Sequence, residues 1–164
     1  MAYLLDANAF IAAKNLHYGF DFCPAFWDWL IESNAAGRLY SIEKVGDEVQ
    51  ALADDLSAWA GARGTGFFPR PDAAVFPSLA VVSQWASGGR YEPSAVSTFL
   101  QIADYYLVAQ AHAGEHIVVT HEVPSASIRK IKIPDAYIGL NLQCVTPFEM
   151  LRRERARFVL GASA

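Results

Sequence analysis

Short apolar runs alternate along the chain with longer segments in which apolar residues recur at helical spacing. Residues 2–5, 116–120 and 143–145 are predicted strands, and residues 39–42 form a further brief extended segment. Helices are expected between these runs. Strands that alternate with helices favour a parallel sheet covered on both faces. We therefore predict an α/β protein with a three-layer α/β/α arrangement and a central, mostly parallel sheet, in a single domain over residues 1–164.

Individual helices are predicted from their start signals and from apolar spacing. One begins near Ala9, a second runs from Pro24 to about Gly37, and others cover residues 78–85 and 104–112. A helix over residues 45–59 is predicted from an apolar stripe formed by Val49, Leu52, Leu56 and Trp59. The last helix starts at Thr146 with a capping box to Glu149, and it is expected to carry Arg152, Arg153, Arg155 and Arg157.

Residues 61–93 differ from the rest because glycine and proline interrupt them repeatedly. Their apolar residues are nevertheless expected to be buried, so the segment is interpreted as an elaborated insertion, or a lid, rather than a linker between domains. These residues are Phe67, Phe68, Val75, Phe76 and Trp85.

Composition narrows the functional classes. The chain is 53% hydrophobic and 18% charged, with a formal net charge of −4, so a generic basic clamp on nucleic acid is excluded. Cys23 and Cys144 cannot make a disulfide framework. Asp6 interrupts the first apolar run, which excludes a signal peptide, and no uncharged run reaches the roughly 20 residues of a membrane helix. A cytoplasmic protein without a membrane partner is expected.

Four acids lie at the ends of predicted elements: Asp6, Glu48, Asp104 and Glu122. Taken singly, Asp6 and Asp104 are explained as helix caps, and Glu48 and Glu122 as solvated side chains. Together they suggest one site, because open α/β sheets place their chemistry at the carboxyl ends of strands. Carboxylates that meet there repel one another and are readily kept ionised by Mg²⁺ or Mn²⁺. Such ions activate water and stabilise charge on a phosphate.

The order of these blocks resembles the PIN-domain ribonucleases, including bacterial toxins of the VapC type. Residues 3–11 are similar to the first strand and acid of that family, and residues 42–49, 103–109 and 117–122 to its second, third and fourth acidic positions. The resemblance spans roughly residues 3–150. It implies a PIN-like fold, a metal-dependent endoribonuclease, and Asp6, Glu48, Asp104 and Glu122 as ligands of Mg²⁺ or Mn²⁺.

Five shorter segments resemble one PIN-like branch whose members look like toxin components encoded beside a helix-turn-helix or metallopeptidase-like partner. They are residues 14–15 with 18–20, 26–29, 119–122, 132–135 and 146–151. This resemblance implies an inhibiting antitoxin protein, and PIN relatives often form homodimers. The chain departs from the family at Glu122, where many PIN enzymes carry Asp or Asn, so either Glu122 or Asp135 completes the acidic site.

Other polar groups have less specific explanations. His112 and His116 are four residues apart, but Gly114 between them argues against a helical zinc pair. His121 is expected to be a hydrogen-bonded turn residue or to contact substrate. Arg129, Lys130 and Lys132 suit a phosphate backbone or a solvated loop equally well.

The sequence thus predicts hydrolysis of an RNA phosphodiester by metal-activated water, with Asn8 orienting Asp6 or that water. Two alternatives stay open. One is a catalytically inactive PIN-like module that binds RNA or a protein. The other is a small-molecule phosphohydrolase with Asp6 as nucleophile, which lacks the second acid that such chemistry needs at position 8.

Overall fold

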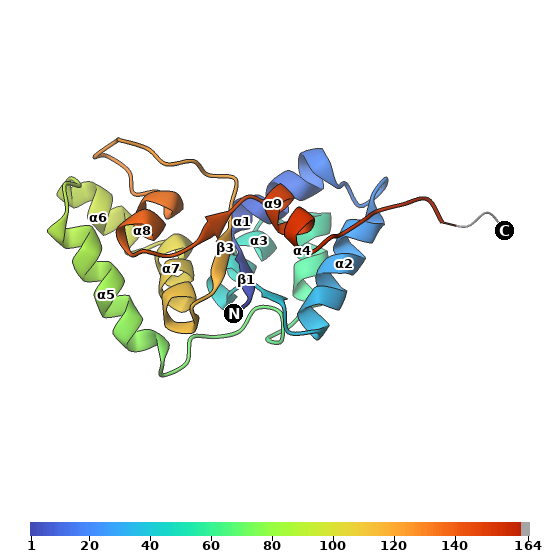
Figure 1. The fold of residues 1–164 in the computed structure, drawn as a ribbon, viewed down its shortest axis with the longest axis horizontal. Coiled ribbons are helices and arrows are strands. Elements are labelled where there is room, and N and C mark those ends of the chain that lie inside the picture. Colours follow the sequence, from blue (N-terminus) through green and yellow to red (C-terminus); the bar gives the residue numbers. More distant parts are fainter. Residues whose placement is uncertain (162–164) are drawn as a thin grey trace.

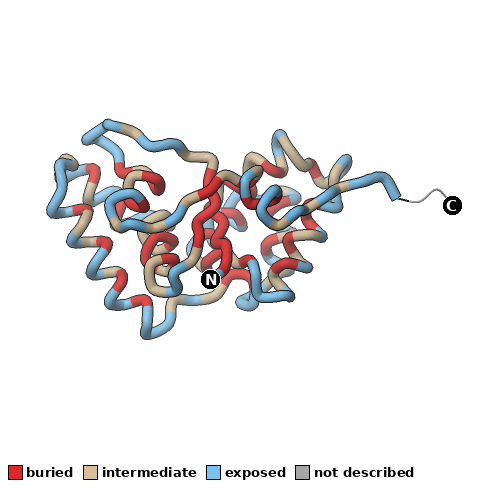
Figure 2. The backbone as a smooth tube through the Cα atoms, in the orientation of Figure 1, coloured by how far each residue is buried: buried red, intermediate tan, exposed pale blue. Residues whose placement is uncertain are grey.

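Four parallel strands form the central sheet of the computed structural model, which describes residues 1–161. They are β1 (Tyr3–Leu5), β2 (Leu39–Tyr40), β3 (Ile117–Val119) and β4 (Cys144–Val145), in the order β2-β1-β3-β4. Leu5 is in register with Val119, so the residues that follow β1 and β3 emerge at the same level of one sheet edge. Figure 2 shows these two strands buried along their length, as expected for parallel strands covered on both faces.

Helices cover both faces, so the predicted three-layer α/β/α fold is confirmed. Figure 1 shows α5 to α8 on one side of β1 and β3, with α2, α4 and α9 on the other. The helices are α1 (Ala7–Ala12), the π-helix η1 (Ala13–His17), α2 (Pro24–Ala35), α3 (Glu43–Gln50), α4 (Asp55–Gly61), α5 (Val75–Gly88), α6 (Pro93–Phe99), α7 (Ala103–Gly114), α8 (Ile133–Gly139) and α9 (Pro147–Arg153).

The segment 61–93 contributes to the core. Phe67, Phe68 and Val75 are buried as expected, and α5 packs along α7. Phe76 is 64% exposed, so its predicted burial is wrong. It follows the buried Val75 directly, and neighbouring positions of a helix face different sides. A lid function of this segment stays a prediction.

The single helix expected over residues 45–59 is two helices. Ala53 adopts a left-handed conformation with φ of 53°, and Asp54 starts α4 by accepting a hydrogen bond from the Ser57 N–H at 3.0 Å. The chain turns between α3 and α4, so Leu52 leaves the predicted stripe and is 46% exposed. A capping signal therefore outweighed helical spacing at this point.

The last helix is shorter than predicted. α9 has the expected capping box between Thr146 and Glu149, but it ends at Arg153. Arg155 has φ of 55° and lies in the turn that ends the helix, and Arg157 lies on the following segment, which has no regular secondary structure. That segment returns along α2 (Figure 1), where the Phe158 ring meets the Phe26 ring edge-on with 6.1 Å between their centroids. In residues 1–161 we find no helix with the length and apolar character needed to traverse a bilayer.

Candidate functional site

Asp6 sits at the carboxyl end of β1 and is 2% exposed. One carboxylate oxygen caps α1 by accepting from the Ala9 N–H at 2.7 Å, and the other accepts from the Thr120 hydroxyl at 2.5 Å. The capping explanation of Asp6 is therefore correct. The bond to Thr120 also joins the ends of β1 and β3, and this fixes the Asp6 carboxylate at the edge of the sheet.

Thr120 links Asp6 to Glu122. Its Oγ1 donates to Asp6 and accepts from the backbone N–H of Glu122 at 3.0 Å. The Glu122 carboxylate in turn accepts from the Ile133 N–H, also at 3.0 Å, at the start of α8. Two hydrogen bonds therefore fix both the backbone and the side chain of Glu122, although the turn that carries it has no regular secondary structure.

Asp135 makes different contacts. Its two carboxylate oxygens accept from the Ser125 N–H at 3.1 and 3.3 Å, which ties α8 to the loop after β3. The electrostatic neighbours of Asp6 are Asp104 and Glu122. Of the two candidates for the fourth acidic position, Glu122 therefore lies with the other acids, and Asp135 has a loop-fixing contact.

Asp104 lies in the first turn of α7, one residue inside the helix. The N-cap of α7 is Ile102, without a side-chain cap bond, so the capping explanation is wrong for Asp104. Its carboxylate is partly buried and close enough to Glu122 and Glu48 to feel both charges. A carboxylate that does not cap its helix is available for another role.

Glu48 comes from α3, which packs against α7. The sequence placed it at a helix start, and this is wrong because α3 begins at Glu43 and ends at Gln50. Glu48 therefore lies on the last turn and is the most exposed of the four acids. Its position on the face toward Asp104 still brings it into the same electrostatic neighbourhood.

Pairwise charge effects connect the four acids: Asp104 and Glu122 act on Asp6, and Glu122 and Glu48 act on Asp104. Burial raises the pKa of Asp6 to about 7 against the favourable hydrogen bonds from Thr120 and Ala9, and the Asp104 and Glu122 charges add to the rise. Burial, Glu122 and Glu48 raise the pKa of Asp104 to about 7, while the Lys130 ammonium lowers it. Partial burial also raises the pKa of Glu48. The structure thus brings together side chains that are up to 116 positions apart in sequence.

The donor set suits a hard divalent cation, since all four groups are carboxylates. The side chains do not already form a closed cage: within residues 1–161, no three His, Cys, Asp or Glu side chains are grouped tightly enough to hold a metal ion. Cation binding at this edge therefore requires side-chain movement that brings at least three of the carboxylates closer together.

Comparison with known proteins gives a family and no neighbour of known activity. The family model described as "Domain of unknown function (DUF4411)" matches residues 3–158. The chain belongs to the DUF4411 family. No curated protein and no solved structure matches it. The matched range contains every helix and strand named above and all four acids.

The sequence analysis of this DUF4411 domain missed Thr120, which connects Asp6 and Glu122. The signal was present in the sequence. Thr120 directly follows β3, and because β3 pairs in parallel with β1, Thr120 lies level with Asp6 at the end of β1. This signal could be used only once the strand register was known. The register is a tertiary property that no local pattern specifies in such short strands.

The basic residue Lys130 is close enough to Asp104 to lower its pKa. Arg129 lies 4.0 Å from Glu92, and Lys132 is the N-cap residue of α8. His112 and His116 serve the fold: His112 is bonded to the Ser78 hydroxyl at 2.8 Å, and His116 Nδ1 accepts from the Ala2 N–H at 3.0 Å.

Replacing Thr120 with Val is expected to lower the free energy of unfolding by about 1–3 kcal/mol, because a buried carboxylate and a backbone N–H both lose a partner. The pKa of Asp6 should rise further, since a hydrogen bond that favours its ionised form is removed. Urea unfolding measures the first effect. Thr98→Val on exposed α6 is the matched control, and equal stability of the two variants would contradict the linking role of Thr120.

Proposed function

We propose that this DUF4411 domain is a metal-dependent endoribonuclease with a PIN-like fold that hydrolyses RNA phosphodiester bonds in the cytoplasm. One observation carries the proposal: Asp6, Glu48, Asp104 and Glu122 come from separate elements and form one electrostatically coupled cluster at the carboxyl edge of the parallel sheet. Two of these acids, Asp6 and Asp104, have pKa values raised to about 7, and carboxyl groups with such strongly raised pKa values cluster at functional sites.

The four carboxylates would hold Mg²⁺ or Mn²⁺. A bound divalent cation supplies Lewis-acid stabilisation of phosphoryl charge and an activated water. The chain's own residues prepare for this. Thr120 and the Ala9 N–H hold the Asp6 carboxylate in place, and Ile133 holds Glu122. Lys130 adds a cation beside Asp104 that suits a phosphate oxygen of the substrate backbone.

The biological context of the proposal rests on the resemblance to PIN-type toxins. In that context the domain is the toxin of a toxin–antitoxin pair, inhibited by an antitoxin protein and acting as a homodimer. A genomic neighbour that encodes a small DNA-binding protein or a metallopeptidase-like protein would support this part of the proposal. RNA cleavage does not depend on the identity of the antitoxin, so an assay with the domain alone tests the chemistry.

The test is cleavage of structured RNAs, with transfer, ribosomal and messenger RNA as separate substrates. We expect discrete products with Mn²⁺ or Mg²⁺ and none with excess EDTA, and we expect calorimetry to detect Mn²⁺ binding that Asp6→Asn abolishes. Absence of both Mn²⁺ binding and cleavage would overturn the proposal. Covalent phosphoryl transfer to Asp6 would establish the phosphohydrolase alternative instead.

A second candidate is a catalytically inactive PIN-like module that binds RNA or a protein partner. It is favoured by the contacts of Asp6, because both oxygens of its carboxylate already accept structural hydrogen bonds. In this case RNA binding would be independent of Mn²⁺ and unchanged by Asp104→Asn. The same titrations therefore separate the two candidates.

A further inference from the structure

A pocket of about 350 Å³ opens beside the acidic cluster, between the first helices and the turn after β3. Its volume is at the lower end of the range of small-ligand sites, about 300–1,000 Å³, and suits a group the size of one nucleotide. It is lined by Asn8, Ile11, Ala12, Asn15, Leu16, His121 and Glu122. Glu122 belongs both to the pocket lining and to the acidic cluster, so the pocket adjoins that cluster.

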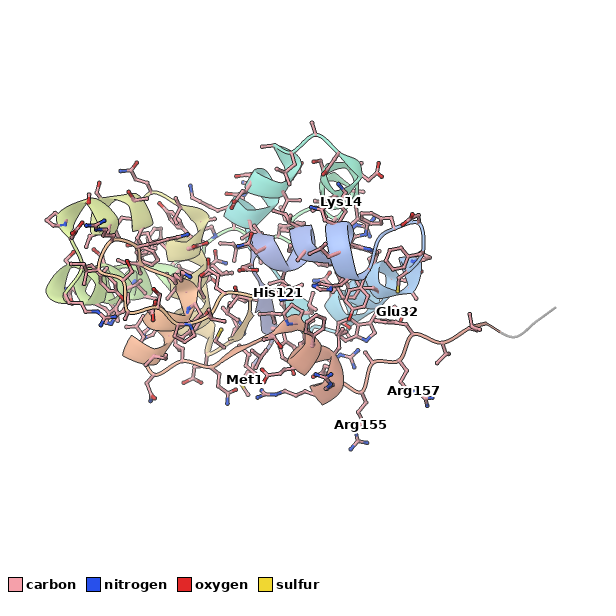
Figure 3. The ribbon with its side chains drawn as sticks, turned by 90° about the horizontal axis from the view of Figure 1, so that it is seen from above. Met1, Lys14, Glu32, His121, Arg155 and Arg157 are labelled. Carbon is pink, nitrogen blue, oxygen red and sulfur yellow. The ribbon has the colours of Figure 1, made fainter. Side chains whose placement is uncertain are left out.

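One wall of this pocket is an aromatic ring held by other rings. The His121 ring lies 5.4 Å from the His17 ring and 5.5 Å from the Phe148 ring, and His17 meets Phe148 edge-on at 5.0 Å. Figure 3 shows His121 between the first helical segment and the last helix. Because its two neighbours come from η1 and α9, the ring is supported from two sides and presents a fixed surface to the pocket.

Another part of the pocket lining comes from an irregular helix. α1 continues into the π-helix η1, which closes with a 2.7 Å hydrogen bond from the Tyr18 N–H to the Ala13 carbonyl. π-helical turns are rare in proteins, and those that occur are often found at functional sites. This turn carries Leu16, which is 72% exposed although it is apolar, next to the exposed amide of Asn15. An apolar side chain that solvent reaches at a pocket rim is suited to cover a flat ligand.

These features match one unpaired nucleobase. Bases of single-stranded RNA are recognised by stacking on aromatic rings, His included, and by hydrogen bonds to their polar edges. We propose that this pocket binds one base of the RNA substrate beside the scissile phosphate, with the base stacked on His121, covered by Leu16 at the rim, and hydrogen-bonded at its edge by Asn8 and Asn15. This inference rests on the proposed function, since it places the base next to the same acids.

Binding of short, labelled single-stranded RNA oligomers, measured by fluorescence anisotropy with Ca²⁺ in place of Mg²⁺, tests the pocket. Homopolymers of each base are compared with an oligomer that contains abasic riboses. The wild-type protein should prefer at least one base to the abasic oligomer. Leu16→Ala and His121→Ala should each weaken that binding by about 10-fold, the size of one lost stacking contact. His121→Phe should restore most of it, because a ring is kept.

Leu160→Ala is the matched control, since Leu160 is an exposed leucine outside the pocket. The base pocket would be overturned if the wild-type protein bound the homopolymers and the abasic oligomer equally well. It would also be overturned if Leu16→Ala and His121→Ala left the affinity for the homopolymers unchanged. Mn²⁺-dependent cleavage with unchanged kcat/KM in Leu16→Ala would overturn the base pocket while leaving the nuclease proposal intact. Base-dependent RNA binding with neither Mn²⁺ binding nor cleavage would support the pocket and overturn the nuclease proposal.

Discussion

Replacing Asp104 with Asn is expected to lower kcat/KM for metal-dependent RNA cleavage by about 100- to 1,000-fold. The loss follows from the central position of Asp104, whose carboxylate is coupled to both Glu122 and Glu48. An amide removes one negative charge from the cation site, and metal-assisted charge stabilisation is worth several kcal/mol in the transition state. Initial rates with Mn²⁺, measured well below KM, give the change directly.

Stability separates this effect from misfolding. Asp104 does not cap α7, so Asn at this position breaks no cap, and it removes a carboxylate whose pKa is raised to about 7. At about pH 8 and without metal, the free energy of unfolding of Asp104→Asn should equal or exceed that of the wild-type protein. Asp28→Asn, on the exposed face of α2, is the control for charge alone. Cleavage by Asp104→Asn at half the wild-type rate or more would remove Asp104 from the site.

Much of the fold was predictable from local patterns. Buried strands of Val, Ile and Leu were recognised because both faces of a parallel sheet are covered, and the start of α9 was recognised from its capping box. Helix ends were less predictable. The breaks at Ala53 and Arg155 need a left-handed residue that is not Gly, and sequence gives no strong signal for such a residue.

The composition of the acidic cluster was predictable, but the reason each acid lies in it was not. Glu48 was chosen as the start of a helix and instead lies on the last turn of α3, where the packing of α3 against α7 brings it toward Asp104. Asp6 was expected to be either a cap or a ligand, yet its geometry serves the cap and leaves it in the cluster. Helix-to-helix packing and strand register decide these positions, and neither is encoded by a local motif.

The buried Asp6 carboxyl group makes the stability of the protein depend on pH. Its pKa is about 7 in the folded protein and near 3.8 in an unfolded chain, mainly because the carboxylate is buried. Between about pH 4 and pH 7 the folded state therefore holds a proton that the unfolded state has released. The free energy of unfolding of the metal-free protein should fall as pH rises through this window and stay lowered above it. Asp6 alone accounts for a loss of about 4 kcal/mol, and Asp104, which titrates in the same region, adds to it.

Asp6→Asn should remove much of this loss. Asn caps a helix as well as Asp does, so α1 is retained, and an amide does not ionise. The variant should match the wild-type protein near pH 4 and be more stable by about 1–3 kcal/mol near pH 8 without metal. With Mn²⁺ the wild-type protein should become the more stable of the two, because the cation binds ionised carboxylates and Asp6→Asn has lost one of them. This stabilisation by Mn²⁺ should be larger near pH 8 than near pH 5.5.

Urea unfolding from about pH 4 to pH 8, with EDTA or Mn²⁺, measures both effects. Asp54→Asn is the control of opposite sign, because Lys14 at 2.9 Å lowers the pKa of Asp54. Its substitution should destabilise the protein near neutral pH, and the difference should fade as pH falls through the lowered pKa. If Asp6→Asn instead destabilises the metal-free protein near pH 8, burial does not strain the Asp6 carboxylate. The acid cluster would then have no electrostatic need for a cation.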